Sequence, residues 1–140
     1  MDQKSQRNNN SEIISNYIKQ RDEYLQNAET FYGKHKYRKS SEMLWGAITQ
    51  TIKAIAAISG IRIIKHNEFF DYIKAVSSEI ENEYYYSEFL KINDLHRNFY
   101  DEFIPPDSYD TVYREALKYL EKLNELLEER IIEKTKSLDK

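Results

Sequence analysis

The stretch "LHRNFYDEF" (residues 95–103) places a histidine, an arginine and several polar side chains within what reads as one helix. Imidazole exchanges protons near neutral pH and guanidinium binds phosphate well, so the pattern is compatible with an acid–base or anion-binding site. On a helical wheel of about 100° per residue, His96 lies on the apolar side and Arg97 points roughly 100° away from it. The wheel therefore favours a core or interface histidine beside a surface arginine that pairs with Asp101. A ligand-facing site stays open as the alternative.

Two other residues could contribute to the same chemistry. Lys53 lies in a largely apolar segment, where its ammonium either reaches out to solvent or faces an anion. His66 precedes an aromatic-rich helix. The candidate ligand-binding or partner-binding residues are His96, Arg97, Asn98, Tyr100, Lys53 and His66.

Other kinds of site lack the residues that they need. There is no cysteine, which excludes disulfides and thiolate catalysis, and the three histidines do not show the i, i+4 spacing of a helical metal motif. Glycine-rich phosphate loops and nucleophile elbows are absent too. We therefore expect no catalytic set, no metal and no cofactor. The run "YYY" at 84–86 could stack on bases, but half-buried packing is the favoured interpretation.

Composition and charge restrict the function classes further. The formal net charge of −3 argues against nucleic-acid binding that is dominated by electrostatic attraction. A local basic patch is still compatible with this charge. No apolar run approaches the ~20 residues that span a bilayer, so we expect a cytoplasmic protein without membrane contact. The richness in Tyr, Ile, Lys and Glu is compatible with a thermophile.

The scarcity of turn residues predicts long helices, since the 140 residues include three Gly and two Pro. Apolar residues recur at helical spacing, and the segment 40–59 is apolar nearly all round, as in the central helix of a bundle. Trp45 is expected in the core there. We predict an all-α, antiparallel, up-and-down bundle of four or five helices. It forms one domain over 11–134, with a disordered tail at 1–10 and a frayed tail at 135–140. The predicted helices run from Ser11 to Gly33, over 40–59, from Asn67 to Ile80, from Ser87 to Pro105 and from Asp107 onward.

Three sequence elements together resemble the archaeal PaREP family, which is usually grouped with the HEPN-like helical bundles. They are "SSEMLWGAITQTIKAIA" at 41–57, a histidine before an aromatic helix, and "LHRNFY". The resemblance covers roughly residues 37–120 and implies a HEPN-like bundle of four or five helices that forms a homodimer. The matching positions are Leu44, Trp45, Gly46, Ala47, Lys53, Ala54, His66, Leu95, His96, Asn98, Phe99 and Tyr100.

The wider HEPN class includes ribonucleases, whose motif is an arginine followed, after four to six residues, by a histidine. After Arg97 the corresponding positions hold Glu102, Phe103 and Ile104, and only three residues separate Arg62 from His66. We therefore expect a non-catalytic homodimeric interaction module that binds a protein or RNA partner.

Two alternatives stay open. One is a divergent HEPN-type ribonuclease with His96 as general base and Arg97 or Lys53 stabilising negative charge. The other is a bundle that holds a small anionic ligand near Lys53, His66, Tyr100 and Arg97.

Overall fold

The computed structural model describes residues 3–101 and 104–138, with side chains described over 9–97 and 104–137. Nearly all of this part of the chain is helical, and no strand occurs in it. The all-α prediction is thus confirmed. The five helices are α1 (Gln3–Gly33), α2 (Tyr37–Ile58), α3 (His66–Glu79), α4 (Tyr84–Asp101) and α5 (Pro106–Leu138).

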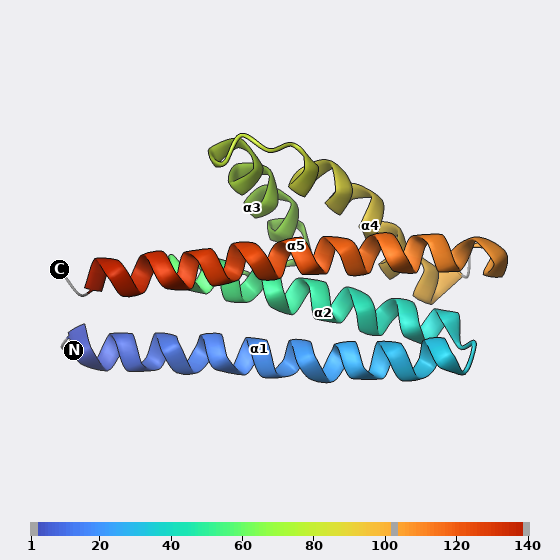
Figure 1. Ribbon diagram of the computed structural model, residues 1–140, viewed down its shortest axis with the longest axis horizontal. Helices are drawn as coiled ribbons and strands as arrows, with labels where there is room; N and C mark the ends of the chain where they lie inside the picture. The colour runs from blue at the N-terminus through green and yellow to red at the C-terminus, as the bar shows by residue number, and fades with distance from the viewer. Residues whose placement is uncertain (1–2, 102–103, 139–140) are drawn as a thin grey trace.

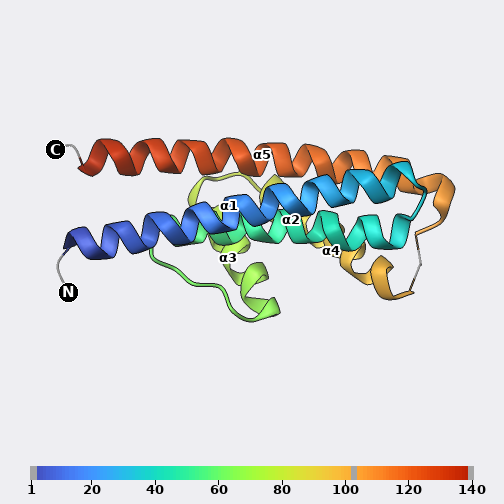
Figure 2. The same ribbon diagram turned by 90° about the horizontal axis from the view of Figure 1, so that it is seen from below.

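The long helices α1, α2 and α5 lie side by side, and the shorter α3 and α4 form a hairpin that leans on them (Figure 1). Figure 2 shows the same grouping from another side. Helix α1 runs against α2, but α5 runs in the same direction as α2. The expected up-and-down alternation therefore fails for this pair. The reason is that α3 and α4 carry the chain back to the end of the molecule where α2 began, so α5 starts there as well.

Helix α2 is the central element, as its composition predicted. It contacts each of the other four helices. Its apolar stripe is buried from Leu44 to Ile58, and Trp45 is only 5% exposed. Gly46 allows a close approach to α1, because a Cβ atom there would lie 2.7 Å from Cδ1 of Tyr24.

Tyrosines close the core at the end of the molecule where α1 turns into α2. The ring of Tyr32 stacks on that of Tyr113 at 4.1 Å, and the ring of Tyr37 stacks on that of Tyr109 at 4.7 Å. Buried hydroxyls are paired, since Ser41 Oγ donates to the Tyr109 hydroxyl at 3.0 Å. Burial raises the pKa of Tyr113 to about 12.

The three consecutive tyrosines contribute mainly to packing. Tyr85 is 8% exposed, and its hydroxyl donates to the carbonyl of Lys122 on α5. The buried Tyr119 hydroxyl donates in turn to the carbonyl of Tyr85 at 2.7 Å. Burial raises the pKa of Tyr119 far above its ordinary value. These contacts fix the start of α4 on α5.

Several helix ends differ from the sequence-based expectation. Helix α1 begins at Gln3, so the predicted start at Ser11 is wrong, and the segment expected to be a disordered tail is helical from Gln3 onward. Its Gln, Lys and Arg residues are good helix formers and nothing there interrupts the backbone. Helix α5 likewise continues through most of the expected frayed tail, to Leu138. Both helices extend past the end of α2 (Figures 1 and 2).

The starts of the other helices move by one to three residues. Helix α2 starts at Tyr37 rather than at residue 40. Helix α3 starts at His66, since the Lys65 amide donates to the Glu68 carboxylate at 2.8 Å. Helix α4 starts at Tyr84, whose amide donates to the side chain of Asn82 rather than being capped by Ser87. Pro106 is the first residue of α5, a position where its missing N–H costs nothing.

Candidate functional site

The six candidate residues come from α2, α3 and α4. Lys53 lies on α2, His66 is the first residue of α3, and His96 and Arg97 lie in the second half of α4. Asn98 and Tyr100 also belong to α4, but their side chains lie outside the described residues.

His96 pairs with a carboxylate that the sequence analysis did not single out. Its Nδ1 atom lies 3.2 Å from Oε2 of Glu42 on α2. The two side chains are 28% and 27% exposed, so the pair is neither sealed in the core nor fully in solvent. The wheel placed His96 toward the bundle, and its half-buried position agrees. One feature of the sequence could have pointed to Glu42. It is a carboxylate on the most apolar helix of the chain, one turn before Gly46.

His66 lies directly against His96. Their ring centroids are 5.3 Å apart with an interplanar angle of 30°. Trp45 contacts both imidazoles, at 5.7 Å from His66 and 5.4 Å from His96, and it is buried beneath them. Two histidines thirty residues apart in sequence are therefore packed together on one indole. We call Glu42, Trp45, His66 and His96 the histidine cluster.

Lys53 extends this surface along α2. Its ammonium lies over the ring of Phe69 at 5.9 Å and over the ring of Tyr17 at 6.0 Å. The Phe69 ring in turn contacts that of His66, with centroids 6.4 Å apart. A continuous series of contacts thus connects Lys53 to the histidine cluster. Each cation–π contact at this range contributes at most about 1 kcal/mol.

Arg97 is directed away from the cluster, as the wheel predicted. Its side chain is 60% exposed and its Nη1 atom lies 3.8 Å from the carboxylate of Asp94. The predicted partner Asp101 has its side chain outside the described residues. An arginine in this position does not share the environment of the His96 imidazole.

The donor set does not form a metal centre. Over the part of the chain that the structure describes, no three His, Cys, Asp or Glu side chains converge as ligands would. The histidine cluster supplies two imidazoles and one carboxylate, but that carboxylate is engaged with His96 and the two rings face each other. What the cluster offers is aromatic surface, hydrogen-bonding groups and the charge of a nearby ammonium.

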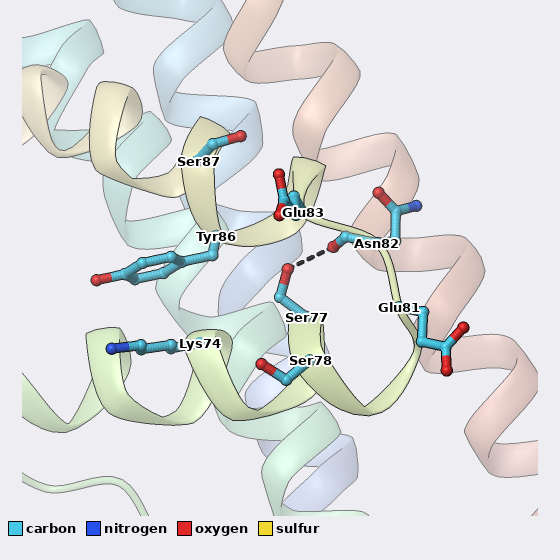
Figure 3. A pocket seen from close by; sticks show the side chains of 8 residues that line it. All are labelled: Lys74, Ser77, Ser78, Glu81, Asn82, Glu83, Tyr86 and Ser87. Atoms are coloured by element: carbon cyan, nitrogen blue, oxygen red, sulfur yellow. Dashed lines mark hydrogen bonds between the residues drawn. The ribbon is translucent and has the colours of Figure 1, made fainter.

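A cavity lies at the turn between α3 and α4, away from the histidine cluster, and sequence reasoning missed it. Its volume is about 540 Å³. Figure 3 shows the Lys74 and Tyr86 side chains on one side of it, and the Lys74 ammonium lies 5.9 Å from the centre of the Tyr86 ring. The Ser77 hydroxyl donates to the Asn82 carbonyl and helps to fix the turn. The cavity is lined by Lys74, Ser77, Ser78, Glu81, Asn82, Glu83, Tyr86 and Ser87.

None of the described helices is both long enough and apolar enough to cross a membrane. A family model described as the archaeal PaREP1/PaREP8 family matches residues 16–123. The chain belongs to this family. In this PaREP1/PaREP8 chain the match includes every member of the histidine cluster as well as Lys53 and Arg97. It ends within α5, before the part of that helix that extends past α2. No curated protein and no solved structure matches the chain.

Proposed function

We propose that this PaREP1/PaREP8 chain is a HEPN-like bundle that acts without catalysis, as a homodimeric module that binds a protein or nucleic-acid partner. The observation that carries the proposal is that neighbouring side chains hold the candidate residues in place. His96, His66 and Lys53 are gathered on one face, yet each is held by another side chain of the same face. Such a surface is preorganised for recognition, and Arg97, which would stabilise negative charge in a nuclease, is 60% exposed and paired with Asp94.

The dimer contact is proposed at the loop that leads into α3. Ile64 is 78% exposed, the most exposed large apolar side chain of the described residues, and Ile61 in the same loop is 46% exposed. Exposed apolar side chains with a polar rim are typical of a subunit interface. Arg62 and Lys65 on one side of His66, and Glu68 and Asp71 on the other, can pair across a two-fold axis.

Sedimentation velocity tests the dimer. We expect a mass about twice the 16.8 kDa of one chain. Replacing Ile64→Asp would place a charge in the interface and weaken the dimer at least tenfold. Ile132→Asp is the matched control, because Ile132 is 53% exposed on α5, which lies on the opposite side from the α2–α3 loop (Figure 2). A monomeric wild type, or equal weakening in both variants, would contradict the proposal.

A divergent ribonuclease is the second candidate, and the pairing of His96 with Glu42 favours it. A carboxylate bonded to Nδ1 holds the imidazole in one orientation and stabilises its protonated form, as a general base requires. Two observations argue against it. Arg97 is exposed and paired with Asp94, and no histidine follows Arg97 or Arg62 at the spacing of the nuclease motif. Labelled RNA incubated with wild type and with His96→Ala separates the two candidates. Cleavage that is lost in the variant would establish the nuclease, and no cleavage by either protein would support the binding module.

A further inference from the structure

The turn between α1 and α2 carries a concentration of positive charge that the histidine cluster does not explain. Residues 34–39 read "KHKYRK", and no acidic residue occurs from 30 to 41. The four cations give this segment +4 in a chain of net charge −3, so the remainder of the chain carries −7. The sequence is thus acidic overall and basic at one place.

The cations of this segment are at the surface of one end of the molecule. Lys34, Lys36 and Lys39 are all exposed. Figure 1 places the α1–α2 turn at the end of the bundle away from both termini. The first turn of α2 contains no acidic residue, and Glu42, the first carboxylate on that helix, is bonded to His96.

Aromatic rings are interleaved with the cations. The exposed His35 lies between Lys34 and Lys36, and its Nδ1 atom is 2.8 Å from the hydroxyl of Tyr37. The Lys39 ammonium lies over the Phe31 ring at 5.6 Å. The stacked tyrosines behind the turn hold these groups on a rigid support. Cations that alternate with rings can contact phosphates and stack on bases at the same time.

We infer that the α1–α2 turn is a binding surface for single-stranded nucleic acid. The lysines contact successive phosphates and the His35 ring offers a face for a base. An acidic peptide would use the cations but not the exposed ring. Asp107 and Asp110 lie at the start of α5, at the same end of the molecule. Because their carboxylates repel phosphates, the bound nucleic acid crosses the turn on the side away from α5.

This inference deepens the proposed function, on which it rests, by naming the partner class and a second surface for it. The surface is separate from the proposed dimer contact. The two ideas can therefore fail independently: a monomer that binds nucleic acid overturns the dimer alone, and a dimer that does not bind overturns the inference alone.

Fluorescence anisotropy of the full chain with a labelled oligouridylate and with oligothymidylate is the test. We expect Kd values of about 1–100 µM at physiological salt. Because up to four phosphates are neutralised and each contributes about 0.7 on a single strand, log K should fall with log salt with a slope of about −2 to −3.

The decisive variant is Lys34→Glu/Lys36→Glu, which should weaken binding at least tenfold. The matched control is Lys118→Glu/Lys136→Glu, which makes the same change in net charge at two separate exposed sites on α5 and should change Kd less than threefold. Lys34→Gln/Lys36→Gln removes the two charges without reversing them, so its Kd should lie between those of the two charge-reversed variants. Circular dichroism checks that all variants are helical. No binding by the wild type, equal loss in both charge-reversed variants, or equal affinity for polyglutamate would overturn the inference.

Discussion

The unit of three long helices and the α3–α4 hairpin are built in different ways. Helices α1, α2 and α5 share a continuous apolar seam, and their end is closed by stacked tyrosines with paired hydroxyls. The hairpin joins the same core through the buried aliphatic residues Ile73 and Leu95 and through aromatic contacts, among which Phe89 stacks on Trp45 at 5.4 Å. The candidate site lies where the two parts meet, since Glu42 and Lys53 belong to one and His66 and His96 to the other. The difference teaches that the long helices provide the scaffold and that the docking of the hairpin assembles the site.

High pH should have the largest effect, because burial raises the pKa of tyrosines in both parts of the molecule, such as Tyr113 on α5 and Tyr85 on α4. Burial raises the pKa of Tyr113 to about 12, and burial also raises the pKa of Tyr109 and of Tyr119. A tyrosine with a raised pKa holds its proton more tightly in the folded chain than in the unfolded one. Its stabilising effect is therefore complete below pH 10 and is lost as the pH rises toward 12.

Urea unfolding measured at steps between pH 8 and pH 12 tests this expectation. The free energy of unfolding should be nearly constant up to about pH 10 and should then decline steeply. Tyr113→Phe removes one of the titrating groups, so its decline should be shallower than that of the wild type. An unchanged slope in this variant would show that Tyr113 is accessible in the folded state.

Phe89→Ala should be the most damaging single substitution for the docking of the hairpin. Phe89 is fully buried and contacts Trp45, Phe70 and Tyr119. Truncating a buried phenylalanine costs about 3–5 kcal/mol. Hydrogen exchange should accelerate in α3 and α4 more than in α1 and α5, because the lost contacts belong to the hairpin.

The neighbouring residue is the control for that substitution. Leu90 is 46% exposed, and Leu90→Ala should cost less than about 1 kcal/mol. If hydrogen exchange in Phe89→Ala accelerated equally in all five helices, the hairpin would not be a separable part of the fold.

Gly46→Ala should have an intermediate effect within the long unit. The added methyl group would lie 2.7 Å from the Tyr24 ring and force α1 and α2 apart, at a cost of about 1–3 kcal/mol. Alanine is otherwise the better helix former by about 1 kcal/mol. In a Tyr24→Ala background the same substitution should therefore stabilise the chain. A destabilising effect in that background, measured by thermal unfolding, would mean that the contact with Tyr24 is not what requires glycine.

The smallest effect is expected at the contact between Glu42 and His96. Both side chains are about a quarter exposed, and ion pairs that are open to solvent contribute roughly 0–1 kcal/mol. A double-mutant cycle with Glu42→Ala and His96→Ala should give a coupling energy within that range. A coupling of several kcal/mol would mean that the cluster stabilises the docking of the hairpin as strongly as its aromatic contacts do.

The sequence predicted the parts of this molecule that depend on local periodicity. The helical class, the central position of α2 and the burial of Trp45 all follow from the spacing of apolar residues. The wheel also separated the directions of His96 and Arg97. Only the approach of three helices could bring His66 onto His96 and Glu42 to the His96 ring, because no local pattern encodes such contacts. The direction of α5 was missed for the same reason: it depends on how α3 and α4 return along the bundle.

Site-specific cross-linking tests the homodimeric module most directly, because the chain contains no cysteine of its own. In the single-cysteine variant Ile64→Cys, two copies related by a two-fold axis at this loop bring their thiols together. We expect mild oxidation to join most of the protein into a disulfide-linked dimer, while the control Ile132→Cys, also at an exposed position, stays a single chain on a non-reducing gel. Equal cross-linking of the two variants, or none at position 64, would contradict the account.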